Sequence, residues 1–170
     1  MMKKNIIIVI MLCLMSCDTK VAGTLGGGYV YEFNCNEVEL NKCLDSFEKK
    51  TKHLHIPQKW EKYNNWNESG YSFLKGKIFY MKSNSELEEE MYYVSVLGSS
   101  QEFKNKSRTS IRAVFRKVGN FPRWLYFEDI SDSNAEIIEN RFQKVVLNKM
   151  TKNSCKCSKK YEIIKEFPDN

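Results

Sequence analysis

The chain has 170 residues, and its 27 lysines and arginines outnumber its 21 acidic residues, giving a formal net charge of +6. A hydrophobic fraction of 42%, with 13% aromatic residues, is enough for a packed core and excludes an intrinsically disordered chain. Only eight glycines and three prolines are present, which excludes a collagen-like sequence, and the length predicts a single domain.

Residues 1–16 have the pattern of a secretory signal peptide. Lys3 and Lys4 precede an uninterrupted apolar run of ten residues, Ile6 to Met15. Ten helical residues cover about 15 Å, half of the roughly 30 Å hydrocarbon core of a bilayer, so this run does not predict a membrane-spanning helix. The run leads into Leu14-Met15-Ser16-Cys17, where a small residue stands directly before a cysteine.

This junction resembles the lipobox of bacterial lipoproteins, in which an aliphatic and a small residue precede the cysteine that receives a lipid. Met15 is larger than the residue that most members carry at its position. The resemblance implies removal of residues 1–16 and lipidation of Cys17. Acyl chains contribute about 0.8 kcal/mol per buried methylene, so we expect permanent attachment to a membrane of the bacterial cell envelope, either inner or outer.

The rest of the chain divides into a short tether and one folded domain. Residues 17–28 are rich in glycine and lack periodicity, which is typical of a flexible linker. Residues 29–170 are expected to form a single globular domain. Its first elements are a strand over 29–33 and a helix from a capping box at Asn36 and Glu39 to about His53.

The middle of the domain favours β-structure. Four stretches are rich in aromatic and β-branched residues and are predicted as strands: 71–81, 91–97, 110–118 and 124–129. Gly119-Asn120 predicts a tight hairpin turn between the last two, and Pro122 predicts an edge position or a bulge. In the strand 110–118 we expect Ile111, Ala113 and Phe115 on one face, and Arg112, Val114 and Arg116 on the other.

A second capping box, Ser133 with Glu136, predicts a helix that runs to about Met150. The order of strand, helix, four strands and helix predicts an α+β fold. We expect an antiparallel sheet of four to five strands with two helices packed on one face.

After lipidation of Cys17, four cysteines remain in the mature chain, and export to an oxidising compartment favours disulfides among them: Cys35, Cys43, Cys155 and Cys157. A bond between the first two would span most of a helix, and one between the last two would close a strained ring. We therefore predict one bond from each of the first two to one of the last two, in either of the two possible combinations. A metal site that combines Cys155 and Cys157 with Cys35, with Cys43 or with the pair His53 and His55 is the alternative, but the spacing of these residues is not that of a zinc motif.

The sequence gives only weak evidence for catalytic groups. The sequence contains no nucleophile elbow, phosphate-binding loop or dinucleotide fingerprint. The acidic run Glu86 to Glu90 is more typical of a solvated turn than of a paired-carboxylate or Ca²⁺ site. We predict no enzyme activity, no cofactor and no metal, and a hydrolase is the least favoured alternative.

Two groups of side chains are candidates for contact with a partner. Arg112 and Arg116 recur along one predicted strand face and could meet an anionic surface. Trp60, Tyr63 and Trp66 could stack on a sugar, anchor an interface or cover the core. We expect a non-catalytic, membrane-anchored domain that binds another envelope protein and no nucleic acid, with a glycan- or lipid-binding module as the alternative.

Overall fold

The computed structural model describes residues 27–65, 76–85, 87–98, 105–153, 155, 157 and 160–164. Within them, six strands form one antiparallel sheet: β1 (Val30–Phe33), β2 (Gly76–Met81), β3 (Glu90–Gly98), β4 (Ser107–Val118), β5 (Phe121–Tyr126) and β6 (Tyr161–Ile164). The helices are α2 (Glu37–Lys50), α3 (Asp132–Phe142) and α4 (Asn148–Asn153), the last two joined by a π-helical segment, Gln143–Leu147.

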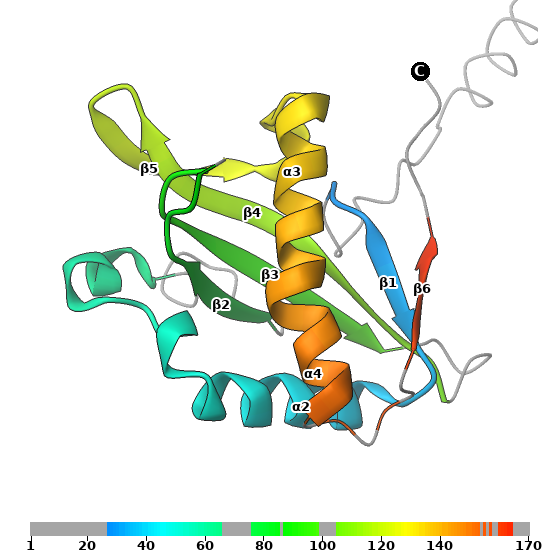
Figure 1. The fold of residues 1–170 in the computed structure, drawn as a ribbon. Helices are drawn as coiled ribbons and strands as arrows, with labels where there is room; N and C mark the ends of the chain where they lie inside the picture. Colours follow the sequence, from blue (N-terminus) through cyan, green and yellow to red (C-terminus); the bar gives the residue numbers. More distant parts are fainter. Residues whose placement is uncertain are drawn as a thin grey trace, which may run out of the picture.

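The strands follow the order β2-β3-β4-β1-β6, and β5 pairs with β4 (Figure 1). Strand β4 is long enough to have two neighbours along one edge. Its first residues, Ser107 to Thr109, pair with β1, and its last residues, Ala113 to Val118, pair with β5. The β4–β5 hairpin therefore extends the sheet beyond the end that β1 covers.

Helix α2 forms where its capping box predicts it. The Asn36 side chain accepts a hydrogen bond from the Glu39 amide at 2.9 Å, and the Glu39 carboxylate accepts one from the Asn36 amide at 3.3 Å. The buried side of the helix carries Leu40, Leu44 and Phe47, at the helical spacing expected of a core-facing stripe. A short 3₁₀ turn, Lys52–Leu54, follows the helix and buries Leu54.

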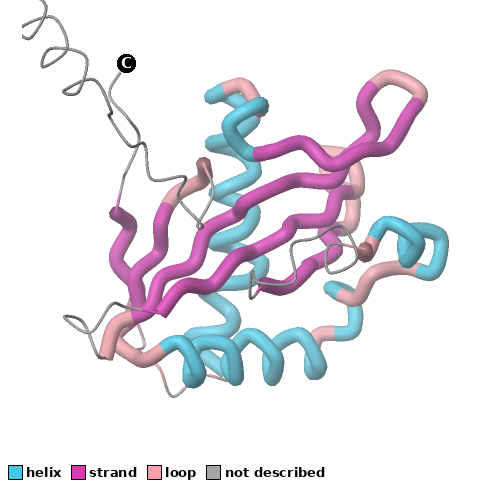
Figure 2. The backbone as a smooth tube through the Cα atoms, turned by 180° about the vertical axis from the view of Figure 1, so that it is seen from behind, coloured by secondary structure: helices cyan, strands magenta, loops and turns pink. Residues whose placement is uncertain are grey.

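The main core lies between one face of the sheet and the helices. Buried side chains from α2, from α3 and its continuation, from strands β1 to β4 and from the 3₁₀ turns form one apolar cluster, including Leu44, Phe142, Tyr31, Tyr92 and Ile111. Leu125 of β5 and Tyr161 of β6 are partly buried and pack against it. Both helices thus cover the same face, and Figure 2, from behind, shows the sheet in front of α3. The α+β prediction is confirmed, and the sheet has one strand more than the upper limit expected.

The start of α3 differs from its prediction. Ser133 and Glu136 do not form a capping box, because the helix already begins at Asp132 with Ser131 as its N-cap residue. The Ser131 side chain makes no capping bond to a backbone amide. Its hydroxyl instead accepts a hydrogen bond from Nδ2 of Asn134 at 3.0 Å.

Two further boundaries were not predicted. The last strand of the hairpin begins at Phe121 rather than at residue 124, and Phe127–Asp129 is a 3₁₀ turn.

Strand β6, which pairs with β1, was not predicted. It has only four residues, of which only Tyr161 packs against the core, so its sequence shows no clear alternation of apolar and polar residues. Residues 71–75 of the predicted strand 71–81 lie outside the described residues.

Candidate functional site

The β4–β5 hairpin projects from one end of the molecule (Figures 1 and 2). Its turn is Gly119-Asn120, with Val118 paired to Phe121. Gly119 has φ of +61°, a left-handed conformation that glycine adopts without a steric penalty. In the described part of the chain β5 pairs with β4 alone, so the predicted turn and the edge position of Pro122 are confirmed.

One face of this hairpin carries an exposed patch. Residues paired across an antiparallel ladder point to the same side, as do residues two apart on one strand. Val118 pairs with Phe121 and Arg116 pairs with Arg123, so all four share the face that also looks toward the helices. Phe121 is 77% exposed, more than any other large apolar side chain in the described residues. We call Val118, Phe121 and Arg123 the hairpin patch.

The predicted pattern of faces along β4 is wrong at its middle. A register shift between Tyr93 and Val94 leaves Arg112 without a paired residue on β3. This bulge reverses the alternation. Ile111 joins the core under the helices, whereas Ala113 and Phe115 pack on the opposite face of the sheet.

The two candidate arginines are consequently in different surroundings. Arg112 lies near Tyr93 on the face away from the helices, and its charge opposes the rise that burial causes in the pKa of that tyrosine. Arg116 lies on the helix side, with its Nε 3.1 Å from Oε1 of Glu90. They do not form the single basic stripe that the sequence predicted.

Glu90 is the centre of a buried ion cluster. Its side chain is fully buried, and Oε2 lies 3.5 Å from Nη1 of Arg141 on α3 and accepts a hydrogen bond from Tyr92 at 2.8 Å. Arg141 also donates to the carbonyl oxygens of Lys82 and Glu88. Burial raises the pKa of Glu90, and the tyrosine and both arginines oppose this rise.

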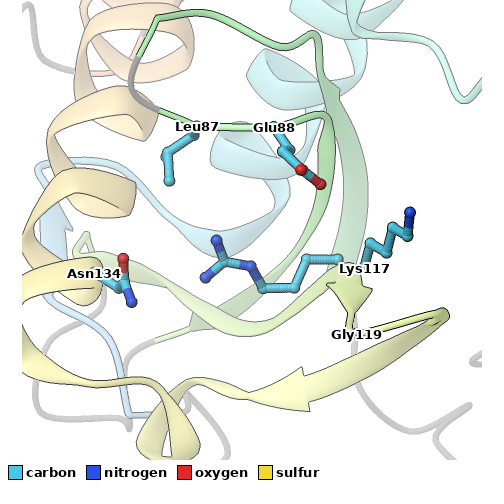
Figure 3. A pocket seen from close by; sticks show the side chains of 6 residues that line it. Leu87, Glu88, Lys117, Gly119 and Asn134 are labelled. Atoms are coloured by element: carbon cyan, nitrogen blue, oxygen red, sulfur yellow. The ribbon is translucent and has the colours of Figure 1, made fainter.

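A cleft of about 400 Å³ lies in front of this cluster, lined by the loop before β3, the end of β4 and the start of α3: Leu87, Glu88, Arg116, Lys117, Gly119 and Asn134. In Figure 3, Leu87 and Asn134 point into the cleft, and Glu88 and Lys117 lie along one side of it. The cleft adjoins the hairpin patch, because Arg116 and Gly119 belong to the same hairpin.

The basic residues at the start of β4 are also paired. Glu32 on β1 is nearly buried and contacts Nζ of Lys106 and, at 3.0 Å, Nε of Arg108. Hydrogen bonds from both cations hold the pKa of Glu32 below its usual value, although burial acts in the opposite direction. These two cations therefore have a structural counter-ion within the domain.

The aromatic candidates cover the second face of the sheet. Trp60 and Tyr63, on the 3₁₀ segment Gln58–Tyr63, pack against Phe115 with ring centroids 5.1 and 4.5 Å away. Lys59 and Lys62 lie over the same two rings, at 5.3 and 4.9 Å from their centroids. Because the chain's own side chains contact both rings, this arrangement favours a covering role over an open sugar-stacking platform. Trp66 lies outside the described residues.

The disulfide prediction is confirmed. Cys35 is bonded to Cys157 and Cys43 to Cys155, which selects one of the two combinations left open by the sequence. The bonds lie side by side, with Sγ of Cys43 3.7 Å from Sγ of Cys157. The sulfur atoms of Cys43, Cys155 and Cys157 lie close enough together to surround a metal ion. All four cysteines are bonded in disulfides, however, so none of them is a thiolate that could bind a metal.

The predictions for the N-terminus concern a part of the chain that the structure does not describe. The signal peptide, Cys17 and most of the tether all precede Gly27. Gly28, at the end of the expected tether, packs against the domain, and a β-carbon there would lie 2.5 Å from Oε1 of Glu139. Among the described residues, no helix is long and apolar enough to cross a membrane.

The interpretation of the acidic run as a solvated turn is wrong for Glu90, which is fully buried at the start of β3. Sequence reasoning also missed Phe121 and Glu139. Phe121 directly follows a predicted tight turn, and an apolar residue beside such a turn is a usable signal of exposure. Glu90 and Glu139 carry no comparable signal, because their burial depends on the pairing of distant segments.

Comparison with known proteins gives no relative: no family model, curated protein or solved structure matches this chain. The candidate site is therefore inferred from the geometry of this chain alone.

Proposed function

We propose that this chain is a lipid-anchored protein of the bacterial cell envelope whose folded domain binds another envelope protein without catalysing a reaction. The lipobox-like junction at Cys17 supports the anchor. The two disulfides support export, because such bonds persist in oxidising compartments.

The hairpin patch is the observation that carries the binding role. An aromatic side chain that is 77% exposed at the tip of a projecting hairpin, next to an arginine, has the composition of interface hot spots. Strand β5 is also an edge within the described sheet, and edge strands can pair with a strand of another protein.

The anchor is tested by replacing the cysteine. The Cys17→Ser chain is expected to lose incorporation of radiolabelled palmitate and to move from the membrane fraction to the soluble fraction, because one thioether carries the lipid. Cys13→Ser is the matched control and should behave as the unaltered chain, since residue 13 lies in the removed signal peptide. Undiminished palmitate labelling of Cys17→Ser would contradict the proposal.

The binding role is tested by a photocrosslinking amino acid at position 121, compared with position 38. Val38 is 59% exposed on α2 and provides an apolar surface away from the hairpin. We expect a discrete protein adduct from position 121 only. Phe121→Ser should then weaken the affinity for the purified adduct partner more than tenfold, and Val38→Ser less than twofold, because hot-spot aromatics dominate binding.

Three outcomes would contradict this role. The first is that positions 121 and 38 give the same adducts, and the second is that position 121 gives adducts with lipid alone. The third is that Phe121→Ser and the unaltered chain bind the purified partner with equal affinity. An adduct with lipid alone would assign the hairpin patch to the membrane surface instead.

A further inference from the structure

The cleft beside the hairpin patch has an excess of positive charge. Among the residues that line it or belong to the ion cluster behind it, three cations, Arg116, Lys117 and Arg141, accompany two carboxylates, Glu88 and Glu90. Arg123 adds a fourth cation on the same face, because it pairs with Arg116 across the ladder. Like charges directly opposite each other on neighbouring strands repel.

Arg116 retains donors for a ligand. An arginine side chain has five N–H donors, four of them on its two terminal nitrogens. Its ion pair with Glu90 is made through Nε, and within the described part of the chain no other contact of this side chain with a protein acceptor is found. The side chain lines the cleft and is 21% exposed. Two terminal nitrogens in this position match the two oxygens of a carboxylate.

Helix α3 adds a second source of positive electrostatic potential, which favours a bound anion. Asn134, in the first turn of this helix, points into the cleft in Figure 3. The side chain of the N-cap residue Ser131 makes no capping bond, so the first-turn amides donate no hydrogen bond to that side chain. Amides at a helix N-terminus favour an anion nearby.

We propose that this cleft binds a carboxylate group of an acidic segment in the partner protein. The proposal rests on the proposed function and names the chemistry of the partner at the same surface. The cleft and the hairpin patch adjoin each other on the β4–β5 hairpin, so an acidic side chain beside an apolar one would contact both. The apolar residue would lie on Phe121, and the carboxylate would lie between Arg116 and the start of α3.

The test is a binding titration of the full-length chain in neutral detergent with a fluorescein-labelled peptide of six glutamates. A peptide of six glutamines is the neutral control. Asn134→Asp places a carboxylate in the cleft at a helix N-terminus, where aspartate is compatible with the fold. Asn140→Asp makes the same change at an exposed position further along α3.

We expect the glutamate peptide to bind and the glutamine peptide not to bind. Asn134→Asp should raise the dissociation constant for the glutamate peptide at least fivefold, and Asn140→Asp less than twofold. Equal effects of the two variants, equal binding of the two peptides, or no binding would overturn the proposal. Binding to phosphatidylglycerol vesicles that is sensitive to Asn134→Asp, without peptide binding, would also overturn it and assign the cleft to a lipid phosphate.

The titration needs no partner protein, so its failure is separable from failure of the proposed function. A partner protein crosslinked at position 121, together with no peptide binding, would overturn only the proposal that the cleft binds a carboxylate. Peptide binding that depends on Asn134, in a chain that crosslinks to no protein, would overturn the proposed function.

Discussion

Replacing both cysteines of one bridge by serine, Cys35 with Cys157 or Cys43 with Cys155, is expected to lower the free energy of unfolding by about 2–5 kcal/mol. The bonded residues are 122 and 112 positions apart, so each bridge removes much of the conformational freedom of the unfolded chain. In the folded chain the bridges fix the segment before β6 to the region of α2, and β6 pairs with β1 through only four residues. Urea unfolding without reductant measures the loss.

Replacing cysteines in bonded pairs avoids leaving a free thiol. A lone Cys35→Ser change would release the Cys157 thiol 3.7 Å from Sγ of Cys43, where it could attack the remaining bridge. Dithiothreitol should destabilise the unaltered chain and have little effect on the chain with all four serines. Alkylation of these four cysteines in the exported, unreduced protein would contradict the disulfide assignment.

The stability of the domain is expected to fall between about pH 4.5 and pH 7 through the buried carboxyl group of Glu139. Its side chain on α3 is fully buried and accepts hydrogen bonds from the Tyr31 hydroxyl at 2.5 Å and the Tyr29 amide at 2.6 Å. Burial raises the pKa of Glu139 from 4.5 to about 7, although both hydrogen bonds oppose the rise.

The sign follows from proton linkage. The folded state holds this proton more tightly than the unfolded state, so the stabilisation is complete below about pH 4.5 and is lost as the pH rises through 7. A shift of this size corresponds to roughly 3 kcal/mol at 1.36 kcal/mol per pKa unit. Relative to Glu139→Gln, which cannot ionise, the unaltered chain should lose about this much stability over the interval.

Urea unfolding at several pH values measures the difference between the two chains. Glu136→Gln, an exposed position on the same helix, is the control and should follow the unaltered chain at every pH. A constant difference between the unaltered chain and Glu139→Gln across pH 4.5–8 would show that residue 139 does not titrate in this way.

Local chemistry predicted the parts of the fold that depend on neighbouring residues. The Asn36–Glu39 capping box placed the start of α2, and Gly119-Asn120 placed the β-turn, because each signal lies within a few residues. The distance along a helix also limited the disulfide pairing. The choice between the two remaining combinations depends on how two distant segments meet, which no local pattern records.

The candidate site could be predicted only in part for the same reason. The bulge at Arg112 arises from the register of β4 against β3, so alternation read from β4 alone assigned Ile111 to the wrong face. Arg116 was identified as a binding candidate, but its contact with Glu90 requires two paired strands. The shared face of Arg116, Arg123 and Phe121 became visible only from the register of β4 with β5.

The position of β1 has a mechanical consequence. Any tension transmitted through the chain ahead of Gly27 enters the domain at β1, whose backbone is hydrogen-bonded to β4 on one side and β6 on the other. Such a load would shear two ladders at once. Unravelling from that end would then be arrested at Cys35 by its covalent link to Cys157. The projecting hairpin lies at the opposite end of β4 and would keep its shape while tension is applied to the N-terminal segment.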